Sequence, residues 1–143
     1  MDPLFADIGN STIKIARLIN GSVERLSYTD HQSVPTDILS SVSLLSNVGI
    51  SLTKQREQFG ECPSVHDMLK GLPLNLAYNY PKKLGQDRIA AMMAAWSYDI
   101  SDTKKKGSFA VIDLGSCVTT DIVNSKGKHL GGNIDLGLLW RIR

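Results

Sequence analysis

Two short segments of this sequence contain an aspartate, a glycine and small polar residues in the same order. Residues 7–12 read Asp-Ile-Gly-Asn-Ser-Thr, and residues 113–116 read Asp-Leu-Gly-Ser. A glycine between two strands lets backbone amides approach a ligand, and the neighbouring polar side chains suit phosphate oxygens. Because a carboxylate repels phosphate, the aspartate would act through Mg²⁺, which prefers oxygen ligands. The repeat predicts two turns that bind a polyphosphate, although each turn taken alone is also compatible with an ordinary hairpin.

A third candidate segment comes before the clearest helix pattern. Residues 85–88 read Gly-Gln-Asp-Arg, which places Asp87 in the expected first turn of the helix. The carboxylate there is either a general base for a hydroxyl group or a group that stabilises the helix N-terminus. Arg88 beside it is suited to bind an anionic substrate through two parallel hydrogen bonds. The sequence leaves both interpretations of Asp87 open.

Other residues give weaker signals. Tyr78 leads into the 85–88 segment and is expected either to line a pocket or to pack against its neighbours. Thr119 and Asp121 alternate on the strand expected after the second turn, so their side chains should share one face. The three histidines and two cysteines have no spacing typical of a metal site, catalytic triad or disulfide framework, and we assign them no role: His31, His66, His129, Cys62 and Cys117.

The composition limits the class of protein. With 143 residues, 42% hydrophobic and 21% charged, the chain has the length and composition of an ordinary globular domain. Its net charge of +2 is too small to predict binding to nucleic acid or to a membrane surface. It has no apolar stretch of membrane-spanning length, and its acidic N-terminus is unlike a signal peptide. We therefore expect a cytoplasmic protein.

The N-terminal half predicts a β-meander followed by mixed elements. Apolar and alternating runs predict strands at 4–8, 12–19 and 22–29. Asn20-Gly21 is typical of a two-residue hairpin, because that turn needs positive φ at both residues. The later pattern predicts a strand at 38–45, a helix at 54–59, a short helix at 63–69 capped by Ser64 and ended by Gly71, and a strand at 74–78.

The C-terminal half predicts one long helix and a second meander. The helix is expected over 85–98, because four apolar residues recur at helical spacing: Ile89, Met92, Met93 and Trp96. A polar connector at 99–107 separates it from strands expected within 108–134. The element order predicts an α/β protein of two related half-domains facing a shared cleft. Residues 1–106 would form the first half-domain, and 107–143 the beginning of an incomplete second one.

Four segments in this order resemble the type III pantothenate kinase family, of the acetate kinase/Hsp70/actin-like superfamily. The matching segments are 7–14, Tyr78 with 84–88, 113–121 and 129–134. The resemblance implies the duplicated actin-like (ribonuclease H-like) fold, with one complete half-domain and the first three strands of the second. Ser116 stands where the family usually has threonine, and Asp135-Leu136-Gly137 stands where it has x-Pro-Gly. The chain corresponds to the first part of the family's length.

The resemblance implies ATP-dependent phosphorylation of pantothenate, the first step toward coenzyme A. The implied ATP-binding residues are Asp7, Ile8, Gly9, Asn10, Ser11, Thr12, Ile13, Lys14 and Ser116. Asp7 would act through the Mg²⁺ bound to ATP. Asp113 would help to hold the monovalent cation, K⁺ or NH₄⁺, that the family requires.

On the substrate side, the resemblance implies that Asp87 is the catalytic base for the pantothenate hydroxyl. The implied substrate-binding residues are Tyr78, Gly85, Gln86, Asp87 and Arg88, with Arg88 on the pantothenate carboxylate. The full-length protein is expected to be a homodimer. Because the second half-domain is incomplete, two alternatives stay open: a non-catalytic nucleotide-binding or regulatory protein of the same fold, and an inactive truncated remnant.

Overall fold

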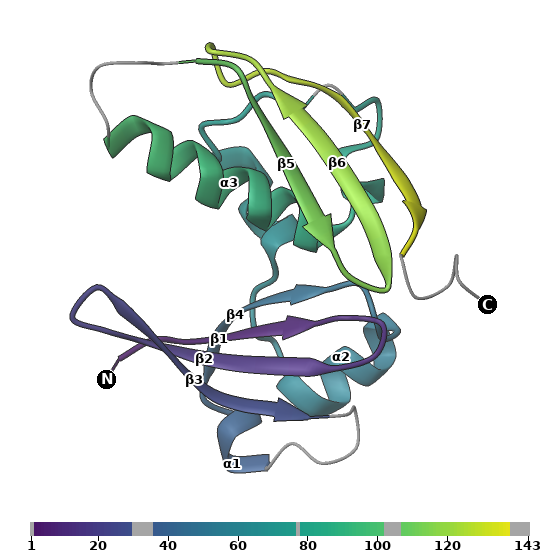
Figure 1. Ribbon diagram of the computed structural model, residues 1–143. Coiled ribbons are helices and arrows are strands. Elements are labelled where there is room, and N and C mark those ends of the chain that lie inside the picture. Colours follow the sequence, from purple (N-terminus) through teal and green to yellow (C-terminus); the bar gives the residue numbers. More distant parts are fainter. Residues whose placement is uncertain (1, 30–35, 77, 102–106, 138–143) are drawn as a thin grey trace. The chain divides into compact units, whose positions relative to one another are not determined.

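The computed structural model describes residues 2–29, 36–76, 78–101 and 107–137 (Figure 1). The chain divides into two compact units, Met1–Met68 and Leu69–Arg143. The first contains a four-stranded sheet and the second a three-stranded sheet. Helices accompany both sheets, so the predicted mixed α/β class is confirmed.

The sheet of the first unit has the strand order β3-β2-β1-β4. An antiparallel meander is formed by β1 (Leu4–Ile8), β2 (Ile13–Ile19) and β3 (Ser22–Thr29), whereas β4 (Val42–Asn47) runs parallel to β1. Asn20 and Gly21 join β2 to β3 with φ values of 48° and 79°. Both values are positive, as the hairpin prediction requires. The N-terminal meander is therefore confirmed.

Two helices complete the core of the first unit. They are α1 (Thr36–Leu39) and α2 (Leu52–Phe59), which is capped where the Ser51 hydroxyl accepts a hydrogen bond from the Lys54 amide at 3.3 Å. Leu39 and Phe59 join the inward side chains of the strands in one apolar cluster: Leu4, Ala6, Ile8, Ile13, Ile15, Val42 and Leu45. Alternation along β1 and β2 places these side chains on one face of the sheet.

The strand predicted at 38–45 is wrong in its first half. Residues 36–39 form α1, and the strand starts only at Val42. The hydroxyls of Ser40 and Ser41 both donate to the Asp37 carbonyl at 3.0 Å. Such local side-chain bonds close a turn at the end of α1 and compete with strand pairing.

A 3₁₀ helix, η1 (Val65–Gly71), follows and spans the division between the units. The amide and hydroxyl of Ser64 both donate to Asp67 Oδ2, at 2.8 and 2.7 Å. The short helix predicted at 63–69, with Ser64 as its cap, is thus present as a 3₁₀ helix that starts at Val65 and includes Gly71.

The second unit consists of η2 (Pro81–Lys83), α3 (Gln86–Ser101) and an antiparallel sheet of order β5-β6-β7. Its strands are β5 (Phe109–Leu114), β6 (Cys117–Val123) and β7 (His129–Leu136), and α3 lies along one face of the sheet (Figure 1). Ile89, Met92 and Trp96 are buried, and the Trp96 ring centroid lies 6.4 Å from that of Phe109. The helix and second-meander predictions are confirmed. No helix in the described part of the chain is long and apolar enough to cross a membrane.

The strand predicted at 74–78 is wrong. Among residues 74–76 and 78, which the structure describes, only Asn75 pairs, in an isolated bridge with Lys128. Its amide donates to the Gly127 carbonyl at 2.9 Å, and its carbonyl accepts from the His129 amide at 2.8 Å. The segment meets a hairpin turn instead of a strand edge, so pairing stops after one residue; residue 77 lies outside the described residues.

The predicted connector at 99–107 is helical up to Ser101, and residues 102–106 lie outside the described residues. The compact units divide after Met68, whereas the half-domain boundary was expected after residue 106. As a result, α3 lies in the same unit as β5 and β6. The two half-domains, 1–106 and 107–143, stay a prediction about the complete fold.

Candidate functional site

The first predicted phosphate turn joins β1 to β2 through residues 9–12. The Gly9 amide donates to the Thr12 carbonyl at 2.9 Å, which closes the turn. Asp7 and Lys14 lie opposite each other in the strand register, and Lys14 Nζ is 3.3 Å from Asp7 Oδ2. Since both side chains are more than 40% exposed, this ion pair is weak, and either partner can exchange it for another charged group.

The side chains of the first turn divide into two groups. Ile8 and Ile13 are buried in the core, so only their backbone atoms can meet a ligand, whereas Asn10 and Ser11 are exposed. Gly9 lacks positive φ, and a Cβ there would lie 3.4 Å from the Thr12 carbonyl oxygen, an ordinary contact distance. The backbone of the first unit therefore does not itself require glycine at this position.

The second predicted phosphate turn joins β5 to β6 through residues 115–116 and is shorter than the first. The Gly115 amide donates to the Cys117 carbonyl at 2.9 Å, and the Gly137 amide donates to the Ser116 carbonyl at 3.1 Å. A Cβ on Gly137 would overlap the carbonyl oxygens of both turn residues. Glycine at 137 thus allows the chain to close against the turn without the proline of the family pattern.

Metal binding by protein side chains alone finds no support in the described part of the chain. It contains no group of three or more histidine, cysteine, aspartate or glutamate residues that could hold a metal ion. Asp7 is half-buried and Asp113 is exposed, and each offers one carboxylate. The single carboxylate of Asp7 fits Mg²⁺ that arrives with ATP, because Mg²⁺ in kinases is held by one or two carboxylates together with substrate phosphates.

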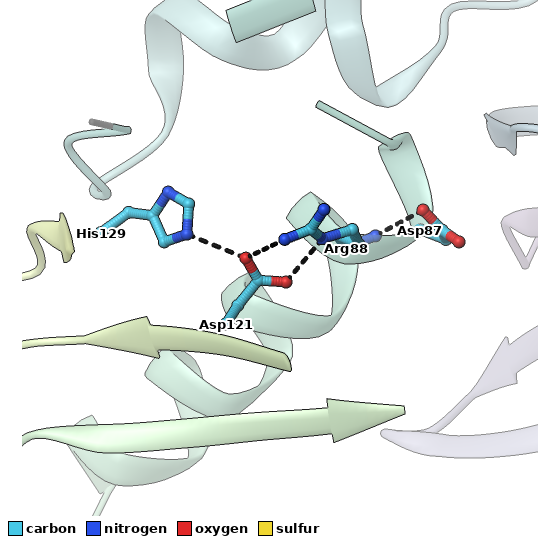
Figure 2. A network of polar contacts seen from close by, with 4 residues as sticks. All are labelled: Asp87, Arg88, Asp121 and His129. Carbon is cyan, nitrogen blue, oxygen red and sulfur yellow. Dashed lines mark hydrogen bonds and ion pairs between the residues drawn. The ribbon is translucent and has the colours of Figure 1, made fainter. Parts of the chain in front are cut away.

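In the second unit, Arg88, Asp121 and His129 form a buried network (Figure 2). Arg88 Nε donates to Asp121 Oδ2 and Arg88 Nη2 donates to Asp121 Oδ1, both at 2.8 Å. His129 Nε2 lies 2.8 Å from the same Oδ1. The side-chain exposures are 11% for Arg88, 3% for Asp121 and 0% for His129. The network ties the first turn of α3 to β6 and β7.

Burial and charge define the protonation states in this network. The hydrogen bond to Asp121 raises the pKa of Arg88 above its ordinary value; burial opposes this shift, while the charges of Asp121, Tyr78 and Asp87 support it. Arg88 therefore remains a cation in this network. A carboxylate can only accept hydrogen bonds, so His129 Nε2 is the protonated ring nitrogen and donates a hydrogen bond to Asp121 Oδ1. Buried His129 Nδ1 has no hydrogen-bond partner among the described residues.

The predicted substrate segment, residues 85–88, contributes Arg88 to this network. The Gly85 carbonyl accepts from the Ile89 amide at 3.2 Å and begins α3, and Asp87 Oδ1 accepts from the Arg88 amide at 2.7 Å. Gln86 is buried, and its Oε1 has no hydrogen-bond partner among the described residues. Tyr78 is 43% exposed, yet close enough to Arg88 to act on its charge. Tyr78 and Asp87 thus both lie close enough to influence the charge of Arg88, and Asp87 is half-buried at the helix N-terminus.

Sequence reasoning missed one member of the network, His129, and one residue packed against it, Gly132. We assigned no role to His129, and no requirement was recognised for Gly132, where a Cβ would overlap Asp121 and the Thr120 carbonyl. Thr119 and Asp121 do share the buried face, as alternation predicted. Asp121 could have indicated this network from the sequence, because a carboxylate at an inward-facing strand position needs a hydrogen-bonding or charged partner.

The chain was compared with known proteins. The family model described as type III pantothenate kinase matches residues 24–142. Relatives named type III pantothenate kinase include those of Bacteroides fragilis YCH46, 31% identical over 98% of this chain and 59% of the relative, and of Phocaeicola vulgatus, 33% identical over 98% and 60%. The relative from Azobacteroides pseudotrichonymphae is 41% identical over 50% of this chain and 27% of its own.

Among solved structures, YeaZ from Pseudomonas aeruginosa aligns with a TM-score of 0.34 and 13% identity, over 94% of this chain and 67% of that one. The chain spans about three-fifths of the length of the relatives that match nearly all of it. The family match covers most of the chain and includes the Gly85–Arg88 and Asp113–Ser116 segments. This chain belongs to the type III pantothenate kinase family.

Proposed function

We propose that this protein transfers the γ-phosphoryl group of ATP to the hydroxyl of pantothenate and so catalyses the first step toward coenzyme A. The observation that carries the proposal is Asp87, a half-buried carboxylate beside the held cation of Arg88, in a chain of this family. The chain spans 59% of the length of the Bacteroides fragilis relative. The phosphorylation of pantothenate is therefore a proposal for this chain and not a property shown for it.

In this mechanism Asp87 is the base. Phosphoryl transfer depends mainly on positioning and charge neutralisation, with one group to orient or deprotonate the nucleophile. Asp87 takes the hydroxyl proton as that oxygen bonds to the γ-phosphorus, and the bond to the β-phosphate oxygen breaks to release ADP. The Arg88 amide bonded to Asp87 Oδ1 holds the carboxylate at the N-terminus of α3, where the helix dipole favours its ionised form.

The ATP site is proposed to include the turn of residues 9–12 with Asp7 and Lys14, and Ser116 of the second turn. Mg²⁺ bound to the phosphates would neutralise their charge, with Asp7 facing it. Asp113 would help to hold the monovalent cation. Glycine at position 9, which the local backbone does not require, supports close approach of a ligand. We further propose a cytoplasmic location and, for the full-length form, a homodimer, whose mass light scattering can test.

The test is an ADP-release assay with pantothenate, ATP, Mg²⁺ and K⁺, with the product identified by mass spectrometry. The protein should form phosphopantothenate, and Asp87→Asn should abolish transfer while leaving the thermal melt unchanged. Asp37→Asn changes an exposed acid of the first unit and should retain full activity. Retained turnover in Asp87→Asn would remove Asp87 as the base. Nucleotide binding without turnover in the unmodified chain would instead support a non-catalytic module.

A further inference from the structure

The guanidinium of Arg88 has one side already committed. Nε and Nη2 bond to the two carboxylate oxygens of Asp121, and Figure 2 shows the third nitrogen directed away from Asp121. That nitrogen, Nη1, has no hydrogen-bond partner among the described residues. A substrate anion therefore cannot accept hydrogen bonds from Nε and Nη2 of Arg88 without displacing Asp121. The family resemblance alone did not exclude that mode of binding.

Asp121 is itself held on a second side. Its Oδ1 accepts from both Arg88 Nη2 and His129 Nε2, each at 2.8 Å. His129 begins β7, and its side chain is fully buried. Gly132 on the same strand lies against the pair, since a Cβ there would overlap Asp121. The Asp121 carboxylate on β6 is thus held in place by His129 and Gly132 of β7, and it in turn holds the guanidinium of Arg88.

We propose that Asp121, held by His129, is a positioning residue that orients Arg88 so that Nη1 faces the carboxylate of the substrate. This inference rests on the proposed function for the identity of the substrate, and on the geometry alone for the orientation of Arg88. Asp121 does not touch the reacting atoms. It sets the direction of one hydrogen bond to a part of the substrate remote from the transferred phosphoryl group.

The kinetic signature follows from that remoteness. The proposal gives the contact between Arg88 and the substrate carboxylate the same strength in the ground state and the transition state, so its loss should raise KM and leave kcat unchanged. A merely structural role for Asp121 would instead lower the fraction of folded enzyme, which reduces kcat at constant KM. Loss of a positioning role therefore changes KM, whereas loss of a merely structural role changes kcat.

The first measurement reads Arg88 directly, without any need for turnover. In ¹H–¹⁵N spectra of the purified chain, the Arg88 Nε–H should exchange with water at least about tenfold more slowly than that of exposed Arg56, because it is bonded and buried. Asp121→Asn should remove that protection. His129→Gln, whose amide can replace Nε2–H, should keep it, and His129→Leu should lose it.

The second measurement is pantothenate kinetics on the same variants. Asp121→Asn and His129→Leu should raise the pantothenate KM by about tenfold, the equivalent of one charged hydrogen bond, with the ATP KM and kcat unchanged. His129→Gln should restore the unmodified KM. Asp67→Asn, which alters the Ser64–Asp67 turn, is the matched control and should leave the Arg88 signal and both KM values unchanged.

The outcomes separate the inference from the proposed function. If the unmodified chain does not phosphorylate pantothenate, the proposed function fails for this chain, while the Arg88 exchange rates still decide the orientation. Fast exchange of Arg88 in the unmodified chain, or protection that survives Asp121→Asn, would overturn the inference. So would a fall in kcat at constant pantothenate KM. Should Asp121→Asn unfold, the comparison of His129→Gln with His129→Leu gives the same decision.

Discussion

Arg88 and Asp121 lie 33 residues apart in the sequence and form a two-bond ion pair, with both nitrogen–oxygen distances at 2.8 Å. One residue lies in the first turn of α3 and the other in β6. The pair therefore couples the helix that carries Asp87 to the sheet beneath it. A substitution in the sheet can therefore change the position of the Gly85–Arg88 segment, although the substituted residue lies outside that segment.

Removing one partner of this pair should be costly. Asp121→Ala leaves Arg88 as a buried cation, and breaking a buried pair in this way costs about 3–5 kcal/mol of unfolding free energy. Urea unfolding followed by tryptophan fluorescence measures the loss. The matched control is the double variant Arg88→Met with Asp121→Leu, which removes both charges and should recover most of the stability. Equal losses in the single and double variants would show that the charge pairing is not the cause.

Gly132 is predicted to tolerate no side chain. In Gly132→Ala the new Cβ overlaps Asp121 and the Thr120 carbonyl, so β7 must shift, at a cost of about 1–3 kcal/mol. The urea midpoint should fall, and the protected Arg88 Nε–H should exchange faster. Gly71→Ala is the control, because a Cβ there meets nothing within 4 Å. A midpoint for Gly132→Ala as high as that of Gly71→Ala contradicts the prediction.

Gly9 is predicted to serve the ligand more than the fold. Gly9→Val should weaken ATP binding by about tenfold or more, since branched methyl groups would occupy the approach of the phosphates to the turn amides. Stability should change less, because a Cβ at Gly9 makes only one contact, at 3.4 Å. Calorimetric ATP titration and a thermal melt, with Gly71→Val alongside, separate the two effects. An unchanged ATP affinity would reject the phosphate-turn assignment.

Cys62 gives a pH-dependent prediction. Burial raises the pKa of its thiol, which also donates to the Val42 carbonyl at 3.2 Å. In a Cys117→Ser background, iodoacetamide should modify Cys62 more slowly in the folded chain than in urea. Because the folded pKa lies above the unfolded one, the contribution of the thiol to stability is complete below pH about 8.5 and declines as the pH rises through the folded value. The stability difference from Cys62→Ala should therefore shrink between pH 7.5 and about 9.5; a constant difference contradicts it.

The elements recovered from the sequence are those whose signals are local. Asn20-Gly21 predicts a hairpin because positive φ is a property of those two residues. The stripe containing Ile89, Met92 and Trp96 predicts α3 because one face of a helix must be apolar. One failure is local in origin, because the serine bonds to Asp37 close a turn where the predicted strand should begin. The other is not, because Asn75 forms a single bridge with Lys128 of a distant hairpin.

Some features of the candidate site follow from local sequence patterns, and others depend on tertiary contacts. The sequence by itself determined the meanders, the helix, the family and the residue types of the turns and of Gly85–Arg88, because neighbouring residues carry those patterns. Only the tertiary structure decided that Arg88 is held by Asp121, that His129 holds Asp121, and that Gly132 must lack a side chain. Those contacts depend on the packing of α3 against β6 and on the β6–β7 register, which bring together residues that no local pattern relates.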